Sequence, residues 1–278
     1  MNMHDFSVLI AVCASDKEEY FEAALKSVYD QSTVPNQVVL VADGPLSVGH
    51  NEIINNYEKL YDGFKCVRLT KNQGLAVALN AGLANCDWEL VARMDSDDIC
   101  ENDRFSRQLY FMNSNPNISV SSGKVTEYSS DMRKFIAEKP LPKGHKEVLT
   151  FSKYRNPINH MACIFRKSAV LAVGGYPEQF LKAQDFALWA VMLKAGYKFA
   201  NIDDNLVNVR AGEGFIKRRG LQYFYGEVIV LRFLKKIRHI NTIELLINLL
   251  IRLGARLSPV IIKQIIYRML RHKGSSQN

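Results

Sequence analysis

The stretch "ELVARMDSDD" (residues 89–98) places three aspartates within four positions, directly behind an apolar run. Residues 88–95, which comprise the run and the aspartate that follows it, have the length and apolar character of a buried β-strand. Carboxylates crowded at one point repel one another and are partly neutralised unless a counter-charge lies among them. The stretch therefore predicts a buried strand that ends in an acidic site able to attract a cation.

The segments before this strand alternate between two patterns. Continuous apolar runs, rich in β-branched residues, predict strands at 6–13, 37–43 and 64–69. Apolar residues at helical spacing predict helices at 17–31, 51–61 and 74–85, and we expect Ser15 or Asp16 to cap the first of them. Such alternation is typical of an open, mostly parallel sheet with helices on both faces, so the predicted fold class is α/β.

The second half of the chain has a more mixed pattern. Its predicted elements are a helix at 102–114, a weaker strand at 118–125, a strand at 161–166, and helices at 167–172 and 184–195. Residues 126–160 contain Pro140, Pro142, Gly144 and Pro157 and are expected to be rich in loops.

From about residue 216 the chain becomes basic and amphipathic. The net charge of the whole chain is +8, but residues 216–278 hold 13 Lys and Arg against 2 Asp and Glu. Residues 1–215 then hold 23 against 26, so the basic excess belongs entirely to this tail. Residues 223–237, 242–257 and 259–273 read as three helices, and basic amphipathic helices favour contact with phosphate-bearing partners.

Several classes of protein are disfavoured by composition. No run of 18 or more uncharged apolar residues predicts a transmembrane helix, and the first residues lack the basic region of a signal peptide. The five cysteines are scattered without CxxC spacing, which favours reduced thiols in the cytosol over a disulfide or zinc framework. The first strand lacks GxGxxG, which argues against a dinucleotide-dependent oxidoreductase.

Polar residues follow three of the predicted parallel strands. Ser15 follows the first, Asp43 ends the second, and Asp95 and Asp97 end the fourth. In open α/β sheets, ligands bind at the carboxyl ends of the strands, where the strand order reverses, so we expect these groups to converge. Hard cations prefer carboxylates, and Mg²⁺ takes one or two of them plus substrate phosphates. The pattern favours Mn²⁺ or Mg²⁺ holding a diphosphate, although a solvated turn or a helix cap is the simpler alternative.

Six segments, in this order and spacing, resemble the inverting glycosyltransferases of family 2 over about residues 5–212. They are "SVLIAVCAS", "VVLVADGP", "NQGLAVALNAGL", "LVARMDSDD", "NPINHMACIFRKSAVLAVGGYPE" and "QDFALW". The resemblance implies the GT-A fold, with a catalytic domain at 1–214, a nucleotide-sugar half at about 1–100, an acceptor half at about 101–214, and the tail at 215–278. It is strongest to bacterial enzymes that build O-antigen and capsule repeat units, which implies a UDP-sugar donor and a polyprenyl-diphosphate-linked saccharide acceptor.

The resemblance also implies a role for particular residues. Asp185 in "QDFALW" would be the general base, although Gln184 stands where the family usually has a second acidic residue. Asp97 would bind the metal, and Asp95 would contact the metal or the ribose. The implied nucleotide-sugar residues are Ala11, Ser15, Asp43, Asn72, Gly74, Arg93 and Asp95, with Asp43 on the uracil ring.

Contacts to the acceptor or a diphosphate are expected from a second set of residues. They are His160, Gly175, Tyr176, Arg210, Arg218 and Arg219. Each has a structural alternative, because a histidine can be a satisfied core residue, a Gly-Gly-Tyr turn can be a helix C-cap, and arginines can form a solvated surface. Asn72 and Gly74 open a helix whose N-terminus is suited to a nucleotide phosphate.

The tail allows more than one interpretation. Basic amphipathic helices suit an anionic membrane, so we expect peripheral attachment at the cytoplasmic face of the inner membrane. Alternatively, these helices pack on the catalytic domain or form a homodimer contact. A nucleic-acid-binding protein is disfavoured because no recognition motif is present and acidic strand ends repel phosphate. A family 2 transferase acting on a soluble or protein acceptor remains the closest alternative, and the sequence does not identify the donor sugar.

Overall fold

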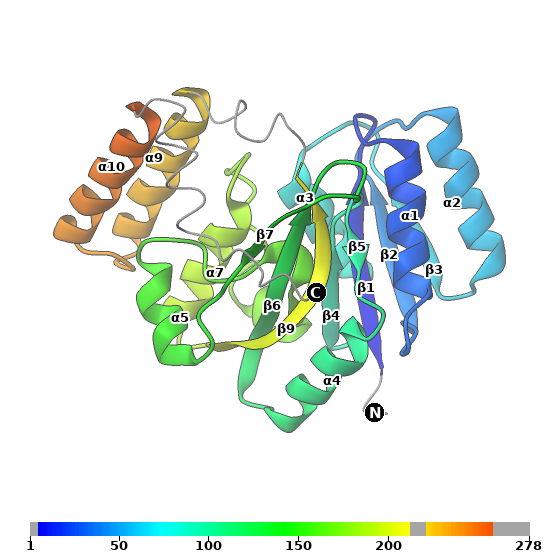
Figure 1. The fold of residues 1–278 in the computed structure, drawn as a ribbon, viewed down its shortest axis with the longest axis horizontal. Helices are drawn as coiled ribbons and strands as arrows, with labels where there is room; N and C mark the ends of the chain where they lie inside the picture. Colours follow the sequence, from blue (N-terminus) through cyan, green and yellow to red (C-terminus); the bar gives the residue numbers. More distant parts are fainter. Residues whose placement is uncertain (1–4, 212–220, 258–278) are drawn as a thin grey trace.

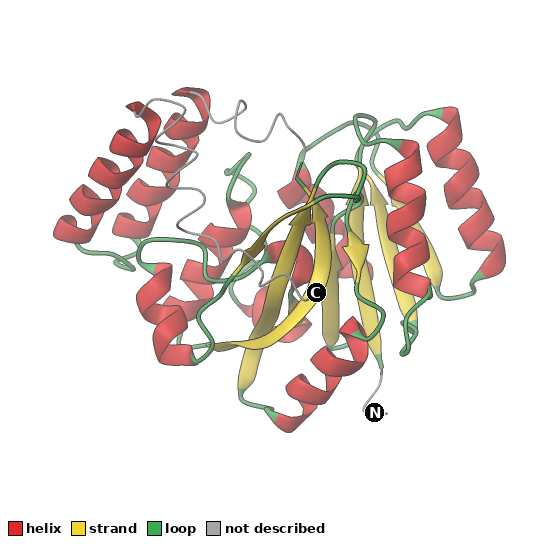
Figure 2. Cartoon of the chain, in the orientation of Figure 1, coloured by secondary structure: helices red, strands yellow, loops and turns green. Residues whose placement is uncertain are grey.

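A computed structural model describes residues 5–211 and 221–257. Its centre is one twisted sheet of nine strands with helices on both sides (Figures 1 and 2). The first part of the sheet is parallel, in the order β3-β2-β1-β4. Its strands are β1 (Phe6–Val12), β2 (Gln37–Ala42), β3 (Phe64–Arg68) and β4 (Leu90–Met94). The helices between them are α1 (Glu18–Tyr29), α2 (Val48–Leu60) and α3 (Leu75–Asn85), which confirms the predicted alternation.

Both faces of this parallel part are buried, because side chains alternate from one face to the other along each strand. Phe6, Val8 and Ile10 of β1 pack in a cluster with Phe21 of α1 and residues of α2. Leu9, between them, lies in the opposite cluster with residues of α3. The continuous apolar runs of the sequence therefore reflect strands covered on two sides.

Beyond β4 the sheet becomes mixed. The order continues β4-β8-β6-β9-β5, with β7 paired to β6. β4–β8, β6–β8, β6–β7 and β5–β9 are antiparallel, whereas β6–β9 is parallel. These strands are β5 (Ile99–Cys100), β6 (Ile118–Tyr128), β7 (Phe135–Lys139), β8 (Ile164–Arg166) and β9 (Lys198–Arg210). The helices are α4 (Arg104–Ser114), α5 (His145–Ser152), α6 (Lys167–Ala172) and α7 (Gln184–Lys194), with a 3₁₀ turn at His160–Ala162.

The longest strand, β9, has no counterpart among the predicted elements. Its 13 residues include Asp203, Asp204 and Asn205, which are poor strand formers. It forms because it pairs along its length with β6, and its end pairs with β5, where Ile99 faces Asn208. This pairing brings Arg210, at the end of β9, next to the segment that follows β4. The region 126–160, expected to be rich in loops, also contains β7 and α5.

The tail packs on the body of the molecule through two helices. α9 (Leu221–Lys236) and α10 (Thr242–Leu257) lie side by side at one end of the structure (Figure 1). Val230, Leu231 and Leu234 of α9 share an apolar cluster with Phe186 and Ala190 of α7. The third predicted helix, at 259–273, and the domain boundary near residue 214 lie outside the described residues. Within the described ranges, no helix has the length and apolar character needed to cross a bilayer.

Candidate active site

The carboxyl end of β4 carries a cluster of three carboxylates. Oxygen atoms of Asp95, Asp97 and Asp98 all lie within 4.8 Å of one another. Arg93, which is 2% exposed, forms an ion pair with Asp95. Asp98 is buried, and its Oδ1 accepts a hydrogen bond of 3.0 Å from the backbone N–H of Arg210. Of the three residues, Asp97 is the most open to solvent.

Burial and the nearby carboxylates raise the pKa values of Asp97 and Asp98. Burial of the carboxyl group, followed by the charges of Asp95 and Asp16, raises the pKa of Asp97 to about 6, although the residue as a whole reaches solvent. Burial, with Asp95 and Asp97 nearby, raises the pKa of Asp98 well above its usual value. A divalent cation among these oxygens would remove the repulsion. The donor set fits Mn²⁺ or Mg²⁺, since it offers hard oxygen ligands.

A fourth carboxylate, Asp16, approaches this cluster from the loop between β1 and α1. Its Oδ2 accepts hydrogen bonds from the backbone N–H of Cys13 at 3.0 Å and from Ser96 Oγ at 2.8 Å. The expectation that Ser15 or Asp16 caps α1 is wrong, because Lys17 is the N-cap and no side chain caps that helix. Asp16 instead ties the end of β1 to the acidic loop after β4. In the sequence, the one sign that Asp16 belongs to the site was its position just after the first predicted strand.

A buried cation, Arg104 of α4, lies behind the acidic loop. The residue is 0% exposed. Its Nη2 donates to the backbone oxygen of Arg93 at 2.6 Å, and its Nη1 lies 3.1 Å from Met94 Sδ and 3.2 Å from Cys100 Sγ. Arg104 therefore contacts residues on both sides of the Asp95–Asp98 segment and holds the two ends of that loop together. No sequence pattern identified it, since it looks like a surface residue of a polar helix.

Asp43 follows β2 and organises the segment before α3. Its two carboxylate oxygens accept hydrogen bonds from the backbone N–H groups of Gln73 at 2.7 Å and Gly74 at 3.0 Å. Asn72 Nδ2 donates to the backbone oxygen of Asp43 at 3.2 Å. Gly44 has φ +94°, and a Cβ there would lie 2.5 Å from the backbone nitrogen of Asn72, so only glycine permits this approach. A carboxylate keeps further acceptor positions after two such bonds.

Asp185 lies in the first turn of α7. Its Oδ2 accepts a hydrogen bond of 2.6 Å from Asn156 Nδ2. Burial raises the pKa of Asp185, while hydrogen bonds from the Phe186 backbone and from Asn156 partly oppose that shift. The residue before Gln184, Ala183, is the N-cap and has φ +58°, a conformation that costs energy for a residue other than glycine. Asp185 is thus held in one position and is more basic than an ordinary aspartate.

Three of the expected acceptor residues take part in packing instead. Tyr176 is 1% exposed, and its hydroxyl lies 3.0 Å from His160 Nε2. Burial lowers the pKa of His160 well below its usual value, so the ring is neutral. Asn80 of α3 bonds both the backbone N–H and the backbone oxygen of Tyr176, and a Cβ on Gly175 would lie 2.7 Å from Asn80 Oδ1. These contacts place the three residues in the packed interior beside the site, and their role in acceptor contact stays a prediction.

Arg210, at the end of β9, is fixed beside the acidic loop. Its Nε donates to the backbone oxygen of Asp97 at 2.7 Å, and its Nη1 donates to that of Ser130 at 2.8 Å. Its guanidinium also lies 4.2 Å from the centre of the Tyr20 ring. The charge of Arg210 therefore stands beside Asp97 in the acidic loop.

The remaining expected residues lie around the same end of the sheet or outside the described ranges. Ala11 is a partly buried residue of β1. Ser15 is exposed, with its Oγ 3.1 Å from Cys13 Sγ. Arg218 and Arg219 belong to residues that the structure does not describe.

Several known proteins are similar to this chain in sequence or in fold. The family model described as glycosyl transferase family 2 matches residues 7–171. The amylovoran biosynthesis glycosyltransferase AmsE of Erwinia amylovora is 36% identical over 263 residues, covering 94% of this chain and 97% of that protein. The UDP-Gal:alpha-D-GlcNAc-diphosphoundecaprenol beta-1,3-galactosyltransferase of Escherichia coli is 34% identical over 264 residues, covering 95% of each.

Solved structures support the fold. S. aureus TarS in complex with UDP-GlcNAc matches with a TM-score of 0.67 at 16% identity, covering 90% of this chain and 73% of that one. The mannosyltransferase PcManGT from Pyrobaculum calidifontis, in complex with GDP-Man and Mn²⁺, matches with a TM-score of 0.63 at 15% identity, covering 94% and 78%. At this identity the structures establish the GT-A-like architecture alone. The family match over most of the sheet, together with two relatives that span nearly the whole chain, shows that this protein is a member of glycosyl transferase family 2.

Proposed function

We propose that this protein transfers a hexose or N-acetylhexosamine from a UDP-sugar to a saccharide carried on a lipid diphosphate, with inversion at the anomeric carbon. The observation that carries the proposal is the convergence of Asp95, Asp97 and Asp98 within 4.8 Å at the end of the central parallel strand. The printed name of the Escherichia coli relative supports the choice of donor and acceptor, because it specifies UDP-Gal and a diphosphoundecaprenol-linked GlcNAc.

Asp97, assisted by Asp95, would hold Mn²⁺ or Mg²⁺ at this site. A cation bound there supplies a Lewis acid for the diphosphate of the leaving UDP. Arg93 orients Asp95 through its ion pair, and Arg210 adds a positive charge beside Asp97. Asp43 and the N-terminus of α3 form the adjoining part of the nucleotide site, where Asp43 is proposed to accept a hydrogen bond from the uracil ring.

Asp185 is the proposed general base. A sugar hydroxyl is a weak nucleophile, so a carboxylate must take its proton as the oxygen bonds to C1 and the bond from C1 to the UDP oxygen breaks. Asn156 orients that carboxylate, and partial burial keeps its affinity for the proton high. The base and the leaving group stand on opposite sides of C1, so the configuration inverts. Alignment of the two substrates supplies much of the remaining acceleration.

Contact with a membrane is proposed for the outer face of α10, at the cytoplasmic side of the inner membrane. That face exposes aliphatic residues: Ile243, Leu246, Ile247, Leu250, Ile251 and Leu253. The basic residue Arg252 faces inward, where it pairs with Glu227. Over residues 242–254 of α10, the surface available to a bilayer is therefore largely apolar, and Arg232, Lys236 and Arg238 are exposed in α9 and the turn after it. Burying each aliphatic side chain would contribute up to roughly 1.5–3 kcal/mol.

The direct test of function is transfer from a panel of UDP-hexoses and UDP-N-acetylhexosamines to GlcNAc on a short synthetic lipid diphosphate. We expect one donor to be used, with product only when Mn²⁺ or Mg²⁺ is supplied, and the new linkage to be of inverted configuration by NMR. Transfer to a free saccharide at an equal rate would favour the soluble-acceptor alternative. Full activity in excess chelator would refute the metal site.

The membrane proposal is tested by flotation with anionic liposomes. Leu250 is 68% exposed on α10, and Leu60 is 70% exposed at the end of α2, so Leu250→Glu and Leu60→Glu form a matched pair. We expect Leu250→Glu to weaken binding about tenfold and Leu60→Glu to leave it unchanged. If Leu250→Glu instead converts a dimer into a monomer and floats normally, this face is a subunit contact.

A further inference from the structure

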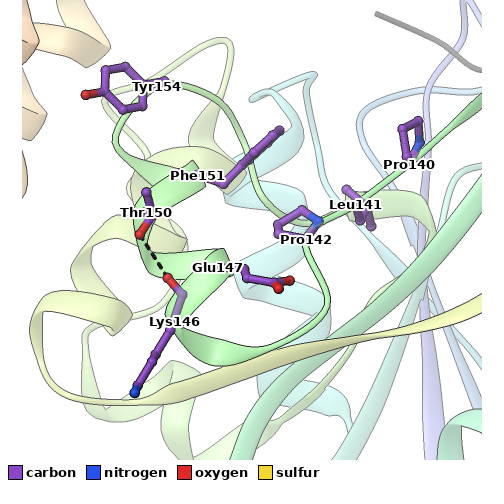
Figure 3. A pocket seen from close by; sticks show the side chains of 8 residues that line it. All are labelled: Pro140, Leu141, Pro142, Lys146, Glu147, Thr150, Phe151 and Tyr154. Atoms are coloured by element: carbon purple, nitrogen blue, oxygen red, sulfur yellow. Dashed lines mark hydrogen bonds between the residues drawn. The ribbon is translucent and has the colours of Figure 1, made fainter.

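A cavity of about 680 Å³ lies beside α5, away from the acidic cluster. Phe151 and Tyr154 line it from α5 and the turn that follows, and Pro140, Leu141 and Pro142 line it from the segment after β7 (Figure 3). It is open to solvent over much of its extent, so it suits a chain that enters from outside rather than an enclosed small molecule. The catalytic proposal above makes no use of this cavity.

Two polar side chains of the cavity wall already form hydrogen bonds within the protein. Glu147 accepts a hydrogen bond from the backbone N–H of Lys143 at 2.9 Å, and Thr150 Oγ1 donates to the backbone oxygen of Lys146 at 3.0 Å. The rest of the wall is aromatic, aliphatic or proline carbon, apart from the exposed Lys146. A ligand that fills such a space has an apolar body and needs few hydrogen bonds.

Each of the two segments that line the cavity continues to a residue that acts on the proposed base. Pro140 directly follows Lys139, whose positive charge lowers the pKa of Asp185. On the other side, Tyr154 is two residues from Asn156, whose Nδ2 donates to Asp185 at 2.6 Å. A molecule in the cavity therefore lies against two segments that also carry Lys139 and Asn156, both of which act on Asp185.

The cavity also adjoins the proposed membrane contact. The backbone oxygen of Tyr154 accepts a hydrogen bond of 3.2 Å from Arg252 of α10. The neighbouring Lys153 forms an ion pair of 2.7 Å with Glu244 of the same helix. These contacts fix α10 against the turn after α5, so its exposed aliphatic face and the cavity belong to one rigid part of the molecule.

We propose that this cavity binds the first isoprene units of the acceptor lipid, on the path from the membrane to Asp185. The inference rests on the lipid-diphosphate acceptor proposed above and adds the place where its hydrocarbon lies. An isoprenoid is apolar and branched, which suits a wall of proline and aromatic carbon. Its diphosphate would meet positive charge at Lys139, and its sugar would then reach Asp185.

The test compares two acceptors that carry the same GlcNAc diphosphate, one on a farnesyl chain and one on an ethyl group, both below their micelle concentrations. We expect the KM of the wild-type protein to be at least about tenfold lower for the farnesyl acceptor. Phe151→Ser should remove most of that preference. Leu149→Ser is the matched control, because Leu149 lies on the same helix, is 38% exposed and does not line the cavity.

Each outcome has a distinct meaning. Equal KM values for both acceptors in the wild-type protein, or equal effects of Phe151→Ser and Leu149→Ser, would overturn the cavity proposal and leave the proposed function standing. Transfer to neither acceptor would overturn the proposed function and this inference with it. If Phe151→Ser fails to fold, a photoreactive farnesyl diphosphate on the wild-type protein decides the matter. Labelling within residues 140–154 supports the proposal, and labelling confined to other segments refutes it.

Discussion

The acidic loop after β4 and the start of α7 both present carboxylates, but in different surroundings. In the loop, burial is the largest cause and neighbouring carboxylates add to it, so the pKa of Asp97 rises to about 6 and that of Asp98 rises well above its usual value. At α7, burial again raises the pKa of Asp185, but no second carboxylate is among the causes. Crowded carboxylates are relieved by a cation, whereas a single buried carboxylate is relieved by a proton. The difference in surroundings supports the proposal of a metal site in the loop and a base at α7.

The largest expected effect comes from removing the base. Asp185→Asn keeps the hydrogen bond from Asn156 through its amide oxygen but cannot accept a proton at neutral pH. We expect kcat to fall about 10²–10⁴-fold while the affinity for the UDP-sugar is unchanged. Turnover measurements and calorimetry with the donor would check both quantities. Retained turnover would remove Asp185 from this role.

Removing a carboxylate from the acidic loop should weaken donor binding rather than the proton transfer. We expect Asp97→Asn to weaken Mn²⁺-dependent binding of UDP about 100-fold, because the cation and the diphosphate bind together. Asp62→Asn, an exposed aspartate in the turn before β3, should have no effect. Calorimetry with UDP, with and without Mn²⁺, distinguishes these outcomes. If Asp97→Asn binds UDP as tightly as the parent protein, the loop is not the metal site.

The two regions should also respond differently to pH. Because the pKa of Asp185 is raised, the base becomes protonated sooner as pH falls, and kcat should drop about tenfold per pH unit below that pKa. Donor binding should weaken below about pH 6, where protons compete with the cation for Asp97. Excess Mn²⁺ should restore donor binding but not kcat. Kinetics from pH 5 to 8 at two Mn²⁺ concentrations would test this, and recovery of kcat by Mn²⁺ would contradict it.

The smallest expected effect on catalysis comes from replacing Arg104, which lies behind the acidic loop. Arg104→Met removes the guanidinium that joins Arg93 to Cys100, so we expect UDP affinity to fall several-fold and the free energy of unfolding to fall by about 2 kcal/mol. Arg107→Met is the control, since Arg107 lies on the same helix and forms partly exposed ion pairs worth about 0–1 kcal/mol. Denaturant unfolding and UDP titration measure the two effects. Equal losses in both variants would mean that Arg104 has no special role in the loop.

The parallel part of the sheet was predictable because its strands are buried on two sides. Continuous apolar runs at β1 and β2, and helical spacing in α1, arise directly from that burial. The acidic loop was also predictable, because a cluster of like charges behind a strand is visible in the sequence. Asp43 was identified from its position at the end of a predicted strand and Asp185 from a family resemblance, and the roles of both remain predictions.

Other features could not be predicted from local pattern. β9 contains aspartates and asparagine that disfavour strands, and it exists because β6 offers a partner. Arg104 is completely buried. Nothing near it in the sequence indicates that its guanidinium donates to a main-chain oxygen. For His160 the sequence left a buried core position and an acceptor contact open, and only the structure shows that it lies 3.0 Å from the hydroxyl of Tyr176 inside the molecule.

Local sequence therefore specifies the α/β class, the parallel half of the sheet and the place of the acidic loop, because these depend on side-chain periodicity and on charge within a few residues. The pairing of β9, the burial of Arg104 and the orientation of α10 depend on contacts between segments far apart in the chain. A residue's partner across such a distance is chosen by packing and by the need to satisfy buried polar groups, and neither leaves a periodic trace in the sequence.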